Sequence, residues 1–226
     1  MKAWLGKPGL AATLSPLFLL LAVPASSPAQ QPATIAVEVT NPQIAPPRWK
    51  LSFDATGQGS FDAEADGVTQ PGRGVVVLGE IHQPLQLSAS FAAHAFAVAH
   101  QRKLFAFPCE SHMKVAFQGM KRFSYTGPDG SGSCEFNFSK DKSIQELSES
   151  FMAVENTLLY GARLEKLLQH DRLGIDKEME DLATAAHNGM AIELGVIRPT
   201  LTRIAGDEQV LERARRKARL LLTQAN

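Results

Sequence analysis

The sequence has few residues of the types that usually reveal chemistry. Only two cysteines, two tryptophans and two tyrosines occur among 226 residues, and 23 basic residues balance 23 acidic ones. Without a positive excess the chain has no field to attract phosphate, so binding to nucleic acid or to an anionic membrane is disfavoured. Beyond the first 29 residues, no apolar run approaches the roughly 20 residues that a membrane-spanning helix needs.

The first 29 residues have the three parts of a secretory signal peptide: two lysines, an apolar run at 17–23, and then small residues and prolines. We expect cleavage near Ala25 or Ala29. A membrane anchor is the alternative, but the apolar run is too short for one. The expected product is an exported protein, periplasmic or extracellular, with no membrane span after cleavage and two more acidic than basic residues.

The two cysteines, Cys109 and Cys134, predict one disulfide, because an exported chain meets an oxidising compartment and two thiols allow one intramolecular pairing. The chain-entropy model values the closed loop at roughly 3 to 4 kcal/mol. Two buried free thiols and an intermolecular bridge remain as alternatives. The pair flanks a predicted antiparallel unit with strands at 113–118, 121–126 and 133–138 and a turn at 128–132.

The chain is strand-rich before Lys140 and helical after it. We divide it into a Pro-rich linker at 30–47 containing one strand-like alternation, a sheet-rich region at 48–140, and a helical region at 141–226 that packs on the sheet or extends from it. The predicted fold class is α+β. It has an antiparallel sheet with one inserted helix in the N-terminal half, and a long helix with a small helical bundle in the C-terminal half.

Alternating apolar and polar residues predict the individual strands. Ile35, Val37 and Val39 form the alternation in the linker, and the sheet-rich region adds strands at 49–53, 60–64 and 75–78 and a brief one at 104–107. The inserted helix is expected to begin at Ser88 or Ser90, either of which can cap it, and to end near Arg102 or Leu104.

The strongest helical signal begins at Ser143, which starts a capping-box pattern, and continues to His170. Gly161 within this helix indicates close packing or a kink. Gly174 suits a left-handed cap, with Asp176 beginning the next helix. Later helices are expected at 176–187 and 192–205, followed by one that starts near Asp207 and runs beyond Arg219.

Two groups of potential metal ligands do not match the pattern of a known type of metal site. Residues 62–67 resemble the start of a calcium loop, but Arg73 stands at the twelfth position, where a bidentate carboxylate is required. The six histidines show no zinc-site spacing, and His94 and His100 are too far apart to chelate together on a helix or a strand. His112 follows Cys109 closely, but a disulfide would consume that thiol. We therefore predict no metal and no cofactor.

Catalytic motifs are equally scarce. The sequence contains no Gly-x-Ser-x-Gly elbow, and Gly57-Gln58-Gly59 and Gly72-Arg73-Gly74 lack the lysine and the strand-to-helix setting of a phosphate loop. No catalytic residue is assigned on this basis. An enzyme assembled from separate loops, such as a hydrolase, remains the alternative.

The concentrated charge feature is a basic segment near the C-terminus. Its members are Arg213, Arg215, Arg216, Lys217 and Arg219. They lie on a predicted amphipathic helix, so we expect the apolar face to pack on neighbouring helices and the basic face to form an interaction surface. The favoured hypothesis is a non-catalytic exported protein that binds a protein, a peptide or an envelope component. Self-association through the helical tail is a further possibility.

Overall fold

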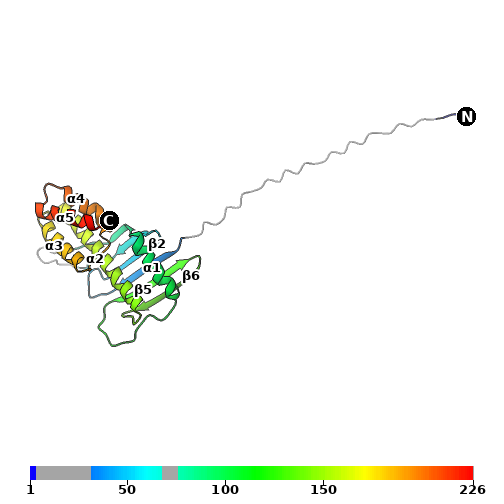
Figure 1. The fold of residues 1–226 in the computed structure, drawn as a ribbon, viewed down its shortest axis with the longest axis horizontal. Coiled ribbons are helices and arrows are strands. Elements are labelled where there is room, and N and C mark those ends of the chain that lie inside the picture. The colour runs from blue at the N-terminus through cyan, green and yellow to red at the C-terminus, as the bar shows by residue number, and fades with distance from the viewer. Residues whose placement is uncertain (4–31, 68–75, 226) are drawn as a thin grey trace. The chain divides into compact units, whose positions relative to one another are not determined.

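A six-stranded antiparallel sheet forms one layer of the computed structural model, which describes residues 1–3, 32–67 and 76–225 (Figure 1). The strand order is β4-β3-β2-β1-β5-β6. The strands are β1 (Thr34–Thr40), β2 (Arg48–Asp54), β3 (Gln58–Ala63), β4 (Ile81–Gln86), β5 (Met120–Gly127) and β6 (Gly130–Phe136). The chain after Gln30 forms one compact unit.

Helices make up the second layer and the C-terminal part of the chain. The α-helices are α1 (Ala89–Gln101), α2 (Lys142–His170), α3 (Gly174–His187), α4 (Arg198–Gly206) and α5 (Glu212–Gln224). Two short 3-10 helices, η1 (Lys103–Phe105) and η2 (Leu194–Ile197), connect them. This confirms the predicted α+β class, with one helix inserted among the strands, a long helix and a C-terminal bundle. The predicted signal segment at 1–29 lies almost wholly outside the described residues.

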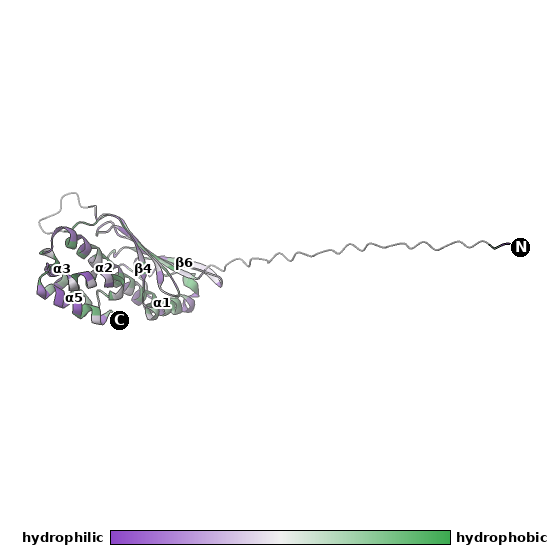
Figure 2. Ribbon diagram, turned by 90° about the horizontal axis from the view of Figure 1, so that it is seen from above, coloured by the Kyte–Doolittle hydropathy of each residue, from purple (hydrophilic) through white to green (hydrophobic). Residues whose placement is uncertain are grey.

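The alternation at Ile35, Val37 and Val39 forms β1, the strand at the centre of the sheet, which pairs with β2 on one side and β5 on the other. Side chains of one sheet face are buried in a core that α1 and α2 share. Figure 2, seen from above, shows both helices on the same side of the sheet. The large buried aromatic side chains on this face are Trp49, Phe53, Phe61, Phe123, Tyr125 and Phe136. Phe151 of α2 packs edge-on to Phe123, with ring centroids 5.5 Å apart.

The opposite, outer face of the sheet carries a row of alternating charges across all six strands. In register order the row is His82, Asp62, Lys50, Glu38, Arg122 and Glu135. Lys50 Nζ lies 2.9 Å from Glu38, and His82 Nδ1 lies 2.7 Å from Asp62. The hydrogen bond to Asp62 raises the pKa of His82. Cross-strand pairs of opposite sign favour this register, and their alternation leaves the row without a single-sign patch.

Helix α2 belongs to two hydrophobic cores. Its N-terminal half contributes Ile144, Phe151 and Leu158 to the core beneath the sheet, and its C-terminal half contributes Leu164 and Leu168 to a core among the later helices. Helices α3, α4 and α5 pack around that second half (Figure 1). The long helix is therefore the element that joins the sheet to the bundle.

Three predicted strands are wrong. The segment at 113–118 is a loop, because its polar backbone is held by a side chain: Asn137 accepts a hydrogen bond from Gln118 N–H at 2.7 Å and donates one to Ala116 O at 3.1 Å. Residues 104–107 begin in η1 and lie against β6, where the backbone of Leu104 closely approaches Gly132.

In the apolar run at 75–78, the described residues 76–78 are not a strand either, and Val75 lies outside the described residues. Leu78 N–H donates to Asp66 at 2.7 Å and Val77 O accepts from Lys166 at 2.6 Å, so side chains replace ladder partners. The sequence analysis missed β4, which follows this run, because it contains Pro84. An edge strand tolerates a proline since its outer N–H groups need no ladder partner.

Several helix ends also differ from expectation. Asp141, not Ser143, caps α2 by accepting a hydrogen bond from Ile144 N–H at 3.2 Å. Gly174 begins α3 instead of forming a left-handed cap, which places Asp176 inside the first turn. The last helix begins at Glu212, because residues 207–210 form a turn. Ser88 caps α1 as predicted, accepting from Phe91 N–H at 3.1 Å.

The predicted disulfide is confirmed. Cys109 and Cys134 are bonded, with Cα atoms 5.8 Å apart and 25 residues of separation. The bond ties the loop after η1 to β6, and Ser111 N–H adds a backbone hydrogen bond to Phe138 O at 2.9 Å. Such bonds are typical of oxidising, extracytoplasmic compartments.

Gly161 provides a test of how α2 meets the bundle. An added Cβ would overlap Cγ2 of Ile197 and lie 3.2 Å from its Cβ, which identifies close packing as the reason for this glycine. Alanine normally stabilises a helix interior by about 1 kcal/mol relative to glycine, but overpacking costs about 1 to 3 kcal/mol. We expect Gly161→Ala to lower the unfolding free energy measured in urea.

The control is the same substitution in an Ile197→Ala background, where Cγ2 is absent. Gly161→Ala should there become neutral or stabilising, giving a coupling of about 1 kcal/mol or more in a double-mutant cycle. An equal loss in both backgrounds would contradict the contact.

Candidate functional site

The basic segment of α5 is engaged with acidic residues of its own chain. Arg213 pairs with Asp176 of α3 at 2.8 Å, and Lys217 pairs with Glu180 of the same helix. Arg215 and Arg219 both reach Glu212 at 2.5 Å. Arg216 is exposed. Two of the five basic residues therefore serve the contact between α3 and α5, and two pair with the first residue of α5 itself. A role for this segment as an interaction surface stays a prediction.

The apolar face of α5 is docked as expected, with Ala214, Ala218 and Leu221 buried in the second core. Leu220 on this helix is 59% exposed, and Leu173 near the start of α3 is 76% exposed. Self-association through these leucines stays a prediction.

The histidines and acids do not form a metal site. Within the described ranges, no three His, Cys, Asp or Glu side chains are grouped so that they could hold a metal ion. His82 lies on the outer sheet face, His94 is exposed on α1, and His112 is exposed in the loop after the disulfide. Asp66 of the calcium-like segment instead accepts the N–H of Leu78 at 2.7 Å.

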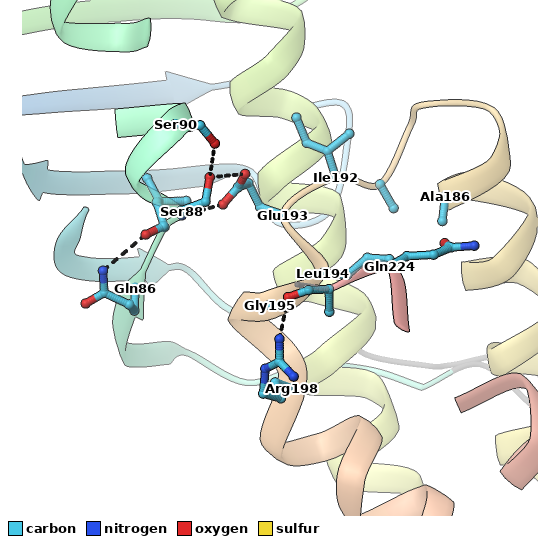
Figure 3. A pocket seen from close by; sticks show the side chains of 13 residues that line it. Gln86, Ser88, Ser90, Ala186, Ile192, Glu193, Leu194, Gly195, Arg198 and Gln224 are labelled. Atoms are coloured by element: carbon cyan, nitrogen blue, oxygen red, sulfur yellow. Dashed lines mark hydrogen bonds between the residues drawn. The ribbon is translucent and has the colours of Figure 1, made fainter. Parts of the chain in front are cut away.

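Two clefts of similar size are found among the residues that the structure describes. The first, of about 540 Å³, lies between the N-terminus of α1 and the C-terminal helices (Figure 3). Glu193, with φ of 54°, turns its carboxylate to Ser88, accepting from the backbone N–H at 2.6 Å and the hydroxyl at 2.8 Å. Arg198 donates to Ala225 O. The chain's own carboxylate thus occupies the helix N-terminus, where an anionic ligand would otherwise bind.

The second cleft, of about 550 Å³, lies between α2, the start of β5 and the turn after α3; we call it the α2 cleft. Its lining residues are Gln118, Lys121, Gln145, Ser148, Glu149, Met152, Ala153, Glu155, Asn156, Gly189 and Met190. Most of the α2 residues among them are three or four positions apart, so they follow one face of the helix. A volume of this size suits a small-molecule or short-peptide ligand.

Glu155 distinguishes the α2 cleft from the first. The residue is only 6% exposed, and no hydrogen bond to its carboxyl occurs among the described residues, but its carboxyl oxygens are not among the fully buried atoms that lack a partner, so they are open to the cleft. Burial raises the pKa of Glu155 to about 8, and Arg163 opposes this shift. Arg163 itself is engaged by Glu178 at 2.5 Å. Glu155 therefore keeps its proton at neutral pH and faces a cleft instead of a partner.

Ser148 is a second buried polar group in the same cleft. It is 2% exposed, and its hydroxyl has no hydrogen-bond partner among the described residues. It precedes Glu155 by two helical turns, so both side chains lie on one face of α2. The cleft thus has two buried hydrogen-bonding groups available to a ligand.

Lys121 supplies a buried cation to the cleft. It is 4% exposed, and Nζ donates to Asn137 O at 2.8 Å and Gly119 O at 3.2 Å. Burial lowers the pKa of Lys121, while the Glu110 carboxylate acts in the opposite direction. Because an ammonium group has three donors, one remains for a ligand.

Sequence reasoning missed the α2 cleft. The available signal was a polar pair, Ser148 and Glu155, placed seven residues apart beside the apolar positions Leu147 and Val154. Such a pair is equally compatible with a solvated helix face. Its burial depends on the turn at Gly189 and Met190, which Asn156 fixes by donating to Met190 O at 2.8 Å.

Comparison with known proteins does not identify the chain: no family model matches it, and neither does any curated protein. In the described ranges, no helix combines the length and apolar character that a bilayer crossing requires. The residues of the α2 cleft are therefore the feature of this chain that bears on its function.

Glu193 gives a prediction for the first cleft. Glu193→Gln keeps the side-chain length but removes the charge that faces the N-terminus of α1, so we expect a loss of about 1 kcal/mol in unfolding free energy. Glu208→Gln, at an exposed position, is the control and should change stability by less than half as much. Equal effects of the two substitutions would show that the contact to Ser88 contributes no more than a surface charge.

Glu155 gives a pH prediction. Its folded pKa of about 8 exceeds the 4.5 that is usual for a glutamate side chain, so between these pH values the folded state holds a proton that the unfolded state releases. The contribution of this group to stability is therefore fully present below about pH 4.5 and is lost as pH rises to about 8, at roughly 1.4 kcal/mol per pH unit.

Glu155→Gln should remove this slope from the unfolding free energy measured in urea between pH 5 and 8. Glu149→Gln, an exposed residue of the same cleft, should retain it. A wild-type slope that survives in Glu155→Gln would mean that Glu155 is ionised in the folded protein.

Proposed function

We propose that this chain is an extracytoplasmic binding protein that holds its ligand in the α2 cleft. The observation that carries the proposal is Glu155, a buried carboxyl group that faces the cleft with no hydrogen-bond partner among the described residues. The carboxyl oxygens of Glu155 are not among the fully buried atoms that lack a partner, so they are accessible from the cleft, where a ligand can donate hydrogen bonds to them. The disulfide supports the compartment.

The contrast between the two clefts supports the choice of site. In the first cleft, Glu193 and Ser88 bind each other. In the α2 cleft, Ser148 and Glu155 are buried and unpartnered within the described part of the chain, and Lys121 retains a donor. Buried groups with shifted pKa values in a cleft are typical of functional sites.

An exported hydrolase is the second candidate, and Glu155 is the observation that favours it. A carboxyl group that keeps its proton at neutral pH has the protonation state of a general acid. Ser148 is a hydroxyl in the same cleft, but no histidine is among the residues that line it. The geometry therefore supports binding more directly than nucleophilic catalysis.

Binding can be tested with a panel of amines, carboxylic acids, sugars and short peptides, followed by amide NMR shifts and thermal unfolding. We expect at least one class to shift the signals of residues 148–156 and to raise the unfolding temperature. Met152→Trp should abolish both effects, because Met152 lines the cleft and is only partly exposed.

Met120→Trp is the matched control, since Met120 is exposed on β5 and does not line the α2 cleft. A panel that leaves residues 148–156 unchanged, or binding that persists in a folded Met152→Trp variant, would contradict the proposal. Cleavage of the panel peptides, seen by mass spectrometry, would favour the hydrolase.

A further inference from the structure

We propose that the α2 cleft binds a short peptide with free termini, about two to four residues long, with its amino group at Glu155 and its carboxylate at Lys121. This inference rests on the proposed function and specifies the ligand class of the same site. It follows from where the cleft places its buried charged groups.

The hydrogen bonds around Lys121 and Glu155 place the two residues toward opposite ends of the cleft. Lys121 Nζ bonds to Asn137 O, and the nearby Ser139 N–H donates to Gln145, so this end adjoins the start of α2. Glu155 adjoins the other end, where its neighbour Asn156 holds Met190. From Gln145 to Asn156, α2 rises roughly 16 Å at 1.5 Å per residue.

This separation explains why the chain does not neutralise the two groups by pairing them. Each pKa shift is caused mainly by burial, and neither group is a cause of the other's shift. A ligand that reaches both must therefore be extended. A single amino acid is too short, whereas an extended peptide advances about 3.3 to 3.6 Å per residue and the two side chains cover part of the span.

The Glu155 end suits an ammonium group. Arg163, the cation that acts on Glu155, is already bound to Glu178 and lies over the ring of Tyr160 at 4.5 Å. Glu149, the other acid of the cleft, is exposed and accepts from Gln145 at 3.0 Å. A peptide ammonium would pair with ionised Glu155, whose proton passes to solvent on binding.

The Lys121 end suits a carboxylate. The remaining Nζ hydrogen can donate to one carboxylate oxygen, and the lining residue Ser148 offers a hydroxyl for a second hydrogen bond. Between the two ends, Met152 and Met190 line the cleft with flexible thioether side chains. Such side chains adapt to different shapes, so the site should select for free termini more than for particular residues.

The test uses trialanine, its N-acetyl derivative and its C-terminal amide, with dissociation constants measured by calorimetry at pH 7.5 on the full mature chain. We expect each blocked peptide to bind at least tenfold more weakly than trialanine, because N-acetylation removes the ammonium that pairs with Glu155 and amidation removes the carboxylate that pairs with Lys121. Glu155→Gln should weaken the binding of trialanine, and N-acetylation should then cause no further loss of affinity. Lys121→Met should also weaken the binding of trialanine, and C-terminal amidation should then cause no further loss of affinity.

The pH dependence gives a separate readout. Between pH 6 and pH 8 the ionised fraction of Glu155 rises about 50-fold, whereas the peptide's own amino group loses about half of its charge, so trialanine should bind roughly 20-fold more tightly at pH 8. Glu155→Gln should lose this dependence, and Glu149→Gln should keep it. A dependence that is unchanged in Glu155→Gln would overturn the assignment of the amino group to Glu155.

Failure of this inference is distinguishable from failure of the proposed function. If the three peptides bind equally, the peptide assignment is wrong and the binding site stands. The same holds if no peptide binds but another panel compound binds the wild-type cleft and fails to bind the Met152→Trp variant. If no compound perturbs residues 148–156, both are wrong.

Discussion

The structure depends on the burial of one helix in two different cores. Along α2, Leu158 and Leu159 belong to the core beneath the sheet, while Leu164 and Leu167 belong to the core of the bundle. No other helix is divided in this way among the buried residues that the structure describes. Since close-packed interiors transmit strain, a shift of α2 would disturb both cores, and Gly161 lies where Ile197 packs closely against this helix.

The same helix also presents a polar face that is neither core nor solvent. Ser148 and Glu155 lie on this face of α2, and the start of β5 and the turn at Met190 line the other side of the cleft. A helix shared between two cores is held rigidly, and rigid elements position binding groups more accurately than loops do. The α2 cleft therefore holds Ser148 and Glu155 on a rigid helix and leaves both side chains available to a ligand.

Sequence patterns correctly predicted the structural features that depend on residues close together in the chain. The alternation at Ile35 to Val39, the stripe of α2 and the cap at Ser88 all appear as expected. The errors concern tertiary partners: residues 113–118 have strand-like composition but bond to Asn137, and β4 contains a proline that only its edge position explains. The α2 cleft was not predicted either, because the residues that line it opposite α2 are far from this helix in the sequence.

The position of β1 has a consequence for the order in which the chain can fold. This strand is the first of the sheet to be synthesised, yet its partner β5 begins only at Met120, 80 residues after β1 ends at Thr40. Until β5 has been made, the centre of the sheet has one open edge and its apolar face lacks α2. Such long-range pairing forms slowly, and the sheet cannot be completed before β5 and α2 have been made.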